Sequence, residues 1–305
     1  MDTVLTTTLE VLGSQPPSLP LSAIDKVDGD LMDWAGLTRL ASKTRLCSPA
    51  SEAEVIEQLA TPGPVRLIGS RLSHAGLIQP RGDNAVLMDI QSLCGVVSVA
   101  NESVTFKAGT TLNEVHRTLT VMGRMMPCSP GVIGLQTLAG ALATGTHGQG
   151  LGQSTISDTV LSLRLVDGRG ALHEASRGDP SFGAIQLGLG CLGVLTEVVL
   201  RTVDTRTFTC HKRTIDADSL ANDLGKWAES FELCKAWWFP EARLVHRWTA
   251  DEATVAEGAA HSSAGGKLMT VSCADSSLNS TSASASAPAP VEPLPKRRRA
   301  IATAM

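Results

Sequence analysis

A run of small residues from Gly140 to Gly150 constrains the fold of this chain more than any other feature. The run reads Gly-Ala-Leu-Ala-Thr-Gly-Thr-His-Gly-Gln-Gly. Side chains this small let the backbone lie directly against a neighbouring element or a ligand. Two interpretations stay open from composition alone. One is a small-residue helix packed closely on a sheet, and the other is a loop whose backbone amides and threonine hydroxyls bind an anion or a flat ring.

A second small-residue loop, Gly69–Gly76, follows a short apolar run. Val65–Ile68 predicts a buried strand that leads directly into Gly-Ser-Arg-Leu-Ser-His-Ala-Gly. Consecutive amides after a strand can converge on an anion, and serine hydroxyls add donors, although a plain tight turn would look the same. The Gly140–Gly150 run lacks the lysine of GxxxxGK[ST] and the spacing of GxGxxG, which disfavours a nucleoside-triphosphate loop and a Rossmann turn.

The pattern of apolar residues predicts a mixture of short strands and helices. Thr111–Glu114 has the sequence of a capping box, so we expect a helix that stops at Gly123. Ser48-Pro49 predicts another helix, with the proline at its first position. Further strands are predicted at Ala85–Ile90, Val96–Val99, Val104–Lys107, Val160–Val166, Gly170–Ala175 and Val194–Val203, the last of them half-buried. This order is not a regular βαβ repeat, so we expect an α+β domain with short antiparallel hairpins.

Composition excludes several classes of protein. The 305 residues carry a formal net charge of −4, which gives no electrostatic reason to expect a nucleic-acid partner. The seven cysteines are scattered and odd in number, so we expect reduced, mostly buried thiols and no zinc site. The N-terminus has no secretory signal pattern, and no apolar stretch is long enough to span a bilayer as a transmembrane segment.

The combination of motifs resembles a known family. Gly69-Ser70-x-x-Ser73, the segment from Ser129 to Gly140, and Ala143–Gly148 are similar to the vanillyl-alcohol-oxidase-type (PCMH-type) FAD-binding domain. Leu192–Thr196 resembles the closing flavin-contact strand of that domain. Asp33–Gly36 and Trp237–Pro240 narrow the resemblance to the sugar-1,4-lactone and alditol oxidases, the D-arabinono-1,4-lactone and gulonolactone group.

The resemblance implies a flavoprotein oxidoreductase with FAD between two small α+β subdomains and a separate substrate domain over the ring. Hydride would pass from a carbinol carbon of a sugar lactone or polyol to flavin N5, with O₂ or another acceptor taking the electrons. The residues implied to contact FAD are Gly69, Ser70, Arg71, Leu72, Ser73, His74, Ser129, Gly131, Thr137, Gly140, Thr144, Thr146, His147, Gly148, Gly193 and Val194.

The sequence departs from the family in two places. Many members carry Gly-Ser-Gly-His-Ser in the first loop, with the histidine linked covalently to the flavin. Leu72 stands at that position and has no nucleophile, so the FAD is predicted to be non-covalent, with His74 as the alternative linking residue. The substrate domain also loses its pattern near Ser272, which predicts a truncated or altered domain. No catalytic base can therefore be named, because His211 and His246 are better explained as strand or surface residues.

These observations predict four regions: an N-terminal extension over 1–30, a PCMH-type FAD-binding domain over 31–205, a partial substrate domain over 206–271 and a disordered Ser/Ala/Pro-rich tail over 272–305. The leading interpretation is an FAD-dependent lactone or polyol oxidase. A flavin-binding protein without turnover and a scaffold that binds nothing are the alternatives. We expect a cytoplasmic location, with association to a mitochondrial membrane as the alternative.

Overall fold

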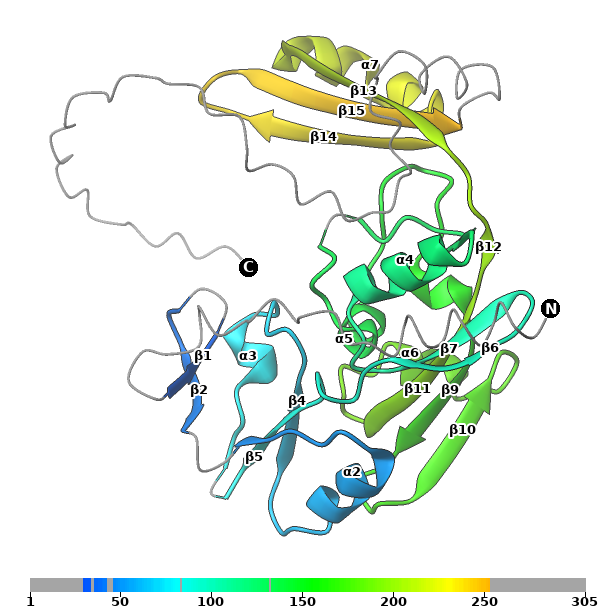
Figure 1. The fold of residues 1–305 in the computed structure, drawn as a ribbon. Coiled ribbons are helices and arrows are strands. Elements are labelled where there is room, and N and C mark those ends of the chain that lie inside the picture. The colour runs from blue at the N-terminus through cyan, green and yellow to red at the C-terminus, as the bar shows by residue number, and fades with distance from the viewer. Residues whose placement is uncertain (1–29, 34–35, 43–45, 83, 132, 253–305) are drawn as a thin grey trace, which may run out of the picture. The chain divides into compact units, whose positions relative to one another are not determined.

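A computed structural model describes residues 30–33, 36–42, 46–82, 84–131 and 133–252 of the chain (Figure 1). The predicted N-terminal extension, apart from Asp30, and the predicted tail lie outside the described residues. Within the described part, five sheets and several short helices make up a mixed fold. The α+β class expected from the sequence is confirmed.

The largest sheet has five antiparallel strands (Figure 1). They are β6 (Val96–Val99), β7 (Ser103–Lys107), β9 (Val160–Val166), β10 (Leu172–Ser176) and β11 (Val194–Arg201), in the order β10-β9-β11-β7-β6. The pairs β6–β7 and β9–β10 are the two hairpins predicted from the sequence. Strand β11 joins them, because it pairs with β7 on one side and with β9 on the other.

Strand β11 differs from its prediction in length and in burial. It ends at Arg201, and the short strand β12 (Val203–Asp204) then pairs with β8 (Arg124–Met125). The consecutive residues Val194, Leu195 and Thr196 are all buried, which requires cover on both faces of the sheet. The predicted strand over Val194–Val203 is therefore present but shorter, and it alternates in burial only from Glu197 to Arg201, because its first three residues are shielded on both sides.

A smaller sheet of three strands is parallel. Its strands are β3 (Leu46–Cys47), β5 (Val86–Asp89) and β4 (Val65–Ile68), in that spatial order. Helices α2 (Glu52–Leu59) and α3 (Ala75–Ile78) connect them. The sequence did not reveal this parallel arrangement, because a two-residue strand and a four-residue helix show no measurable period. A separate antiparallel pair consists of β1 (Asp30–Met32) and β2 (Arg39–Ser42).

Two helix starts were predicted, and one of them needs correction. Helix α2 begins at Glu52, and Ser51 is its N-cap, with its hydroxyl accepting from the Glu54 amide at 3.2 Å. Pro49 thus precedes the helix instead of occupying its first position. Helix α4 (Leu112–Val121) begins with the predicted capping box of Thr111 and Glu114. Gly123 follows it with a φ of +66°, the left-handed conformation that ends many helices.

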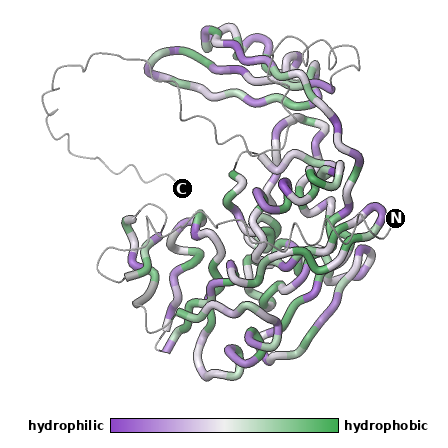
Figure 2. The backbone as a smooth tube through the Cα atoms, viewed as in Figure 1, coloured by the Kyte–Doolittle hydropathy of each residue, from purple (hydrophilic) through white to green (hydrophobic). Residues whose placement is uncertain are grey.

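The main core lies between the five-stranded sheet and the helices that pack on it, α4 and α5 (Leu138–Ala143). Its fully buried side chains include Phe106, Leu112, Val115, Leu119, Leu138, Leu142, Val198 and Leu200. Figure 2 shows apolar stretches along these elements. Two further short helices, η3 (Ile156–Thr159) and α6 (Phe182–Gln186), lie on the way from α5 to β11. The core thus fixes the start of the small-residue run, which lies in α5.

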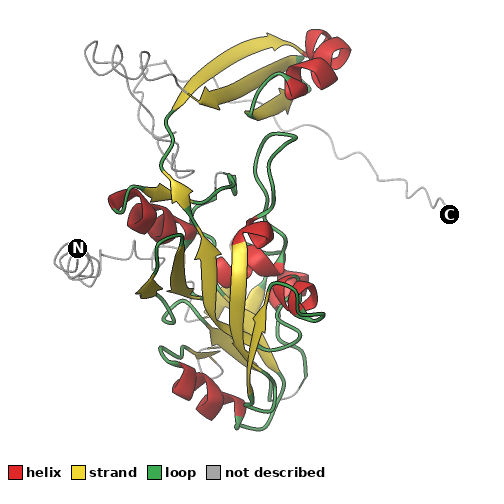
Figure 3. Cartoon of the chain, turned by 90° about the vertical axis from the view of Figure 1, so that its right-hand side faces the viewer, coloured by secondary structure: helices red, strands yellow, loops and turns green. Residues whose placement is uncertain are grey.

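The segment that carries four of the five tryptophans forms a sheet and a helix of its own. Strands β13 (Phe208–Asp216), β15 (Leu244–Glu252) and β14 (Leu233–Phe239) are antiparallel, in that order, and helix α7 (Ala217–Glu229) packs against β13 and β15 (Figure 3). Trp227 of α7 is buried, with the Arg247 guanidinium 4.5 Å from its ring centre. No helix in the described ranges is long and apolar enough to cross a bilayer.

Candidate cofactor site

A cavity of about 350 Å³ lies where three loops meet. The first loop, Gly69–His74, follows β4. The second lining segment runs from Gln136 through α5 to Thr144, and the third, Gly188–Gly193, precedes β11. We call this space the loop cavity. Its volume falls in the range of sites for small molecules and cofactors.

The first loop packs directly against the start of α5. A Cβ atom added at Gly69 would lie 2.3 Å from Thr137 Oγ1, so no larger residue fits there without displacing one of the segments. The next residue, Ser70, is buried and its hydroxyl donates to the Leu135 carbonyl. The first loop is therefore in contact with the segment Leu135–Thr137, which leads into the second small-residue region.

Arg71 occupies the position at which the family pattern has its second glycine. Its φ of +58° is left-handed, a conformation that costs a residue with a Cβ atom about 1–2 kcal/mol. The side chain is buried, and its guanidinium donates to the Met32 carbonyl of β1 at 3.3 Å. This bond to a neighbouring strand offsets part of the backbone strain and holds a positive charge at the wall of the loop cavity.

Helix α5 confirms the closely packed helix for the start of the Gly140–Gly150 run, and ligand binding by the loop stays a prediction. Thr137 caps the helix by accepting from the Gly140 amide at 3.2 Å, and Ala141 and Leu142 are buried in the core. The helix therefore packs closely, and the chain continues as a loop from Thr144. Gly140 and Thr144 line the loop cavity, and the Thr144 hydroxyl donates to the Gly140 carbonyl at 3.0 Å.

The lining contains more apolar than polar side chains, and several are exposed to solvent. Those at the rim are Leu72, Leu77, Ile133, Leu189 and Leu192. Exposed apolar residues around one cavity are typical of a ligand site. Of these, only Leu72 was among the residues implied to contact FAD, although Leu192 begins the segment that resembles the flavin-contact strand. The signal that could have found Leu189 and Leu192 is their place in the glycine-rich stretch Gly188–Gly193.

The charges at the loop cavity have one sign. Arg66 and Arg71 line it, and no aspartate or glutamate occurs among the described lining residues. An anionic group is therefore favoured there, and the apolar rim suits a flat ring. An FAD molecule, with its diphosphate and its isoalloxazine ring, fits both properties.

The predicted site residues divide into two groups. Gly69, Ser70, Arg71, Leu72, Ser73, His74, Thr137, Gly140, Thr144 and Gly193 line the loop cavity. Ser129, Gly131, Thr146, His147, Gly148 and Val194 lie outside its lining, and their contact with a cofactor stays a prediction. Thr146 contacts a lining residue, because its hydroxyl accepts a hydrogen bond from the side-chain amide of Gln136 at 3.0 Å.

The loop after Thr144 is packed tightly on the segment at Ser129. A Cβ atom at Gly148 would lie 1.3 Å from the Ser129 carbonyl oxygen, so these two backbones touch. His147 forms an isolated antiparallel bridge with Thr155. Ser129 and Gly131 thus pack against the segment Thr146–Gly148.

Comparison with known proteins shows which proteins this chain resembles in sequence and in fold. Residues 44–176 match the family described as FAD binding domain, and residues 198–290 match D-arabinono-1,4-lactone oxidase. The fold is similar to that of cholesterol oxidase from B. sterolicum, with a TM-score of 0.65 and 20% identity over 78% of this chain and 50% of that one. Alkyldihydroxyacetonephosphate synthase aligns with a TM-score of 0.57 and 17% identity over 72% and 50%. Residues 44–176 are thus similar in sequence to an FAD-binding domain, and the described part of the chain shares its fold with these two solved proteins.

Curated proteins that are similar to this chain in sequence are named as sugar-lactone oxidases and dehydrogenases. D-arabinono-1,4-lactone oxidase from Candida albicans is 32% identical over 50% of this chain and 27% of its own length. The enzyme of the same name from Eremothecium gossypii is 28% identical over 71% and 42%. L-gulono-1,4-lactone dehydrogenase from Mycobacterium tuberculosis is 30% identical over 70% and 51%. The chain therefore spans from about a quarter to a half of the length of these relatives.

Proposed function

We propose that this chain is an FAD-dependent oxidoreductase that binds its cofactor non-covalently and oxidises a CH–OH group of a sugar lactone or polyol. The observation that carries the proposal is the loop cavity, with two arginines, no described carboxylate and an apolar rim. When bound, FAD supplies a ring that accepts hydride from the substrate carbon. The relatives named for D-arabinono-1,4-lactone and L-gulono-1,4-lactone support the choice of substrate class.

The residues of the chain would bind and orient the cofactor. The guanidinium groups of Arg66 and Arg71 provide positive charge for the diphosphate, and hydroxyls such as those of Ser73 and Thr144 provide donors. The apolar rim excludes water from the ring. The proposed FAD-binding domain covers 31–205 and the proposed partial substrate domain covers 206–271.

Non-covalent binding follows from the side chain at Leu72. A leucine has no atom that can form a bond to the flavin, although it lines the loop cavity. His74 also lines the cavity and is the one alternative linking residue of the first loop. After denaturation in acid, we expect the yellow colour to separate from the protein. Colour that stays with the chain and disappears in His74→Ala would contradict non-covalent binding and identify His74 as the link.

The test of the reaction is anaerobic reduction of the bound flavin. We expect the purified chain to show flavin absorbance, and D-arabinono-1,4-lactone or L-gulono-1,4-lactone to bleach it without oxygen. Admission of air should restore the colour if O₂ is the acceptor, as we propose. A chain that binds no FAD would contradict the cofactor assignment.

A second candidate is a flavin-binding protein without turnover. The share of the relatives' length that the chain spans, from 27% to 51%, favours keeping this alternative. Bound FAD that no lactone or polyol bleaches would support it over the oxidase.

For location we propose the cytoplasm, and cell fractionation distinguishes this from association with a mitochondrial membrane.

A further inference from the structure

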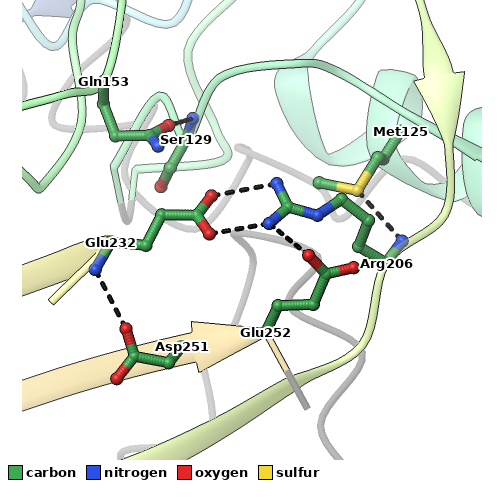
Figure 4. Close-up of polar contacts among 7 residues, drawn as sticks. All are labelled: Met125, Ser129, Gln153, Arg206, Glu232, Asp251 and Glu252. Carbon is green, nitrogen blue, oxygen red and sulfur yellow. Dashed lines mark hydrogen bonds and ion pairs between the residues drawn. The ribbon is translucent and has the colours of Figure 1, made fainter. Parts of the chain in front are cut away.

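A cluster of charged side chains outside the loop cavity connects three segments of the chain (Figure 4). Arg206, which leads from β12 into β13, donates two hydrogen bonds to Glu232, at 2.9 Å and 2.6 Å. It also donates to Glu252 at the end of β15, at 2.8 Å. The bidentate geometry is the strongest arrangement available to an arginine and a carboxylate. The hydrogen bonds that Arg206 donates to Glu232 and Glu252 raise the pKa of Arg206 above its ordinary value.

The backbone of Glu232 is held from a second side. Its amide donates to the Asp251 carboxylate at 3.0 Å, as Figure 4 shows. The Glu232 residue, just before β14, is therefore fixed both through its side chain and through its backbone. Its position depends directly on Arg206, Glu252 and Asp251.

The carbonyl of Glu232 lies against the end of the second small-residue loop. A Cβ atom at Gly150 would lie 2.2 Å from the Glu232 carbonyl oxygen. Gly150 also has a φ of +109°, a conformation that residues with a Cβ atom rarely adopt. The fixed carbonyl and this glycine thus form a close backbone contact between the charged cluster and the loop Thr144–Gly150.

The contact continues toward the residues predicted to bind FAD. The Gln153 side chain would lie 3.2 Å from a Cβ atom at Gly150, and its carbonyl oxygen accepts from the Ser129 amide at 3.3 Å. Ser129 in turn touches Gly148. One chain of contacts therefore runs from Arg206 through Glu232 and Gly150 to the segments at Ser129 and Thr144–Gly150.

We propose that the Arg206–Glu232 pair positions the loop Thr144–Gly150 for cofactor binding, although neither residue lines the loop cavity. This inference rests on the proposed binding of FAD. The side chains of Arg206 and Glu232 are each about one third exposed, at 34% and 32%, so the pair adds little to global stability. The pair sets the position of the loop Thr144–Gly150, and the affinity for FAD measures this effect.

The experiment measures FAD dissociation constants with the full chain stripped of flavin, by quenching of flavin fluorescence. We expect Arg206→Ala and Glu232→Gln to weaken binding by about tenfold or more, and the exchanged pair Arg206→Glu with Glu232→Arg to recover part of the loss. Arg243→Ala is the matched control, because it breaks the Arg243–Asp218 ion pair, which joins the turn before β15 to helix α7. Binding by Arg206→Ala that stays within about twofold of the unaltered chain would overturn the proposal, as would an equal loss in Arg243→Ala.

A glycine pair tests the same contact from the loop side. Gly150→Ala places a methyl group against the Glu232 carbonyl and should weaken FAD binding. Gly152→Ala should not, because a Cβ atom there meets nothing within 4 Å. Equal affinities for the two variants would contradict the role of the Gly150–Glu232 contact.

Amide hydrogen exchange separates this proposal from the proposed function. In the flavin-free chain, we expect Glu232→Gln to increase exchange at residues 144–150, whereas Arg243→Ala should not. An unaltered chain that binds no FAD refutes the proposed function, and the exchange result then still decides whether the pair positions the loop. Unchanged exchange in Glu232→Gln, with native circular dichroism, would refute the positioning role.

Discussion

At the scale of single residues, His116 of α4 is the buried titratable group with the clearest consequence. Its Nε2 atom has no hydrogen-bond partner among the described residues, and burial lowers its pKa from 6.5 to about 4. The imidazole lines a cavity of about 40 Å³ that Arg206 and Glu232 also line. The folded chain thus binds a proton at His116 less readily than the unfolded chain does.

Acid should therefore destabilise the fold through this residue. Stability is lost as the pH falls from about 6.5 to about 4, because only the unfolded chain takes up the proton in that range. The expected loss is about 3 kcal/mol in the free energy of unfolding. Urea unfolding at the two ends of this range measures it, and His116→Leu should remove most of the difference. His211→Gln, at an exposed strand position, should leave it unchanged; an equal loss in all three proteins would refute this assignment.

Gly69 and Gly76, at the two ends of the small-residue segment Gly69–Gly76, offer a matched comparison. Gly69→Ala should weaken FAD binding by about tenfold or more, because its Cβ atom would lie 2.3 Å from Thr137 Oγ1 and force the loop away from α5. Gly76→Ala should bind FAD normally, since the space around it is open and it lies in helix α3. Fluorescence titration measures both affinities. Normal FAD binding by Gly69→Ala would show that the contact between the first loop and Thr137 does not shape the site.

At the scale of elements, the start of helix α4 depends on the capping box formed by Thr111 and Glu114. Thr111→Ala should destabilise the chain by about 1 kcal/mol, because it removes the acceptor for the Glu114 amide. The same substitution at Thr120, exposed within the helix, should be neutral or slightly stabilising, since alanine favours helix. Denaturant unfolding of both variants measures the difference, and equal stabilities would argue against the cap.

Local patterns predicted those elements whose determinants lie within a few residues. The capping box predicted α4, and apolar runs predicted the strands β4, β6 and β9. The central place of β11 and the parallel pairing of β3, β5 and β4 depend on contacts between distant segments, which no local period encodes. The same distinction applies to the site. Gly69–His74 was recognisable as a motif, whereas the apolar rim contributed by Leu77, Ile133 and Leu189 appears only once three loops come together.

At the scale of the whole molecule, cofactor binding and stability are linked. A ligand that binds only the folded chain stabilises it by about 2.7 kcal/mol when present at about one hundred times its dissociation constant. We expect FAD to raise the midpoint of thermal unfolding, and riboflavin, which lacks the diphosphate, to raise it less. Scanning fluorimetry with each compound measures the two shifts. Equal shifts would mean that the arginines at the loop cavity do not contact a diphosphate.

The central position of β11 has a consequence for biosynthesis. Its partners β7 and β9 end at Lys107 and Val166, and each already belongs to a hairpin with a nearby strand. These hairpins leave the ribosome early, but the edges that face β11 stay unpaired until Arg201 has emerged, because Val194–Arg201 is the strand between them. Unpaired edges can join other chains. The nascent protein therefore passes through a period, until residue 201 has emerged, in which two open strand edges expose it to aggregation.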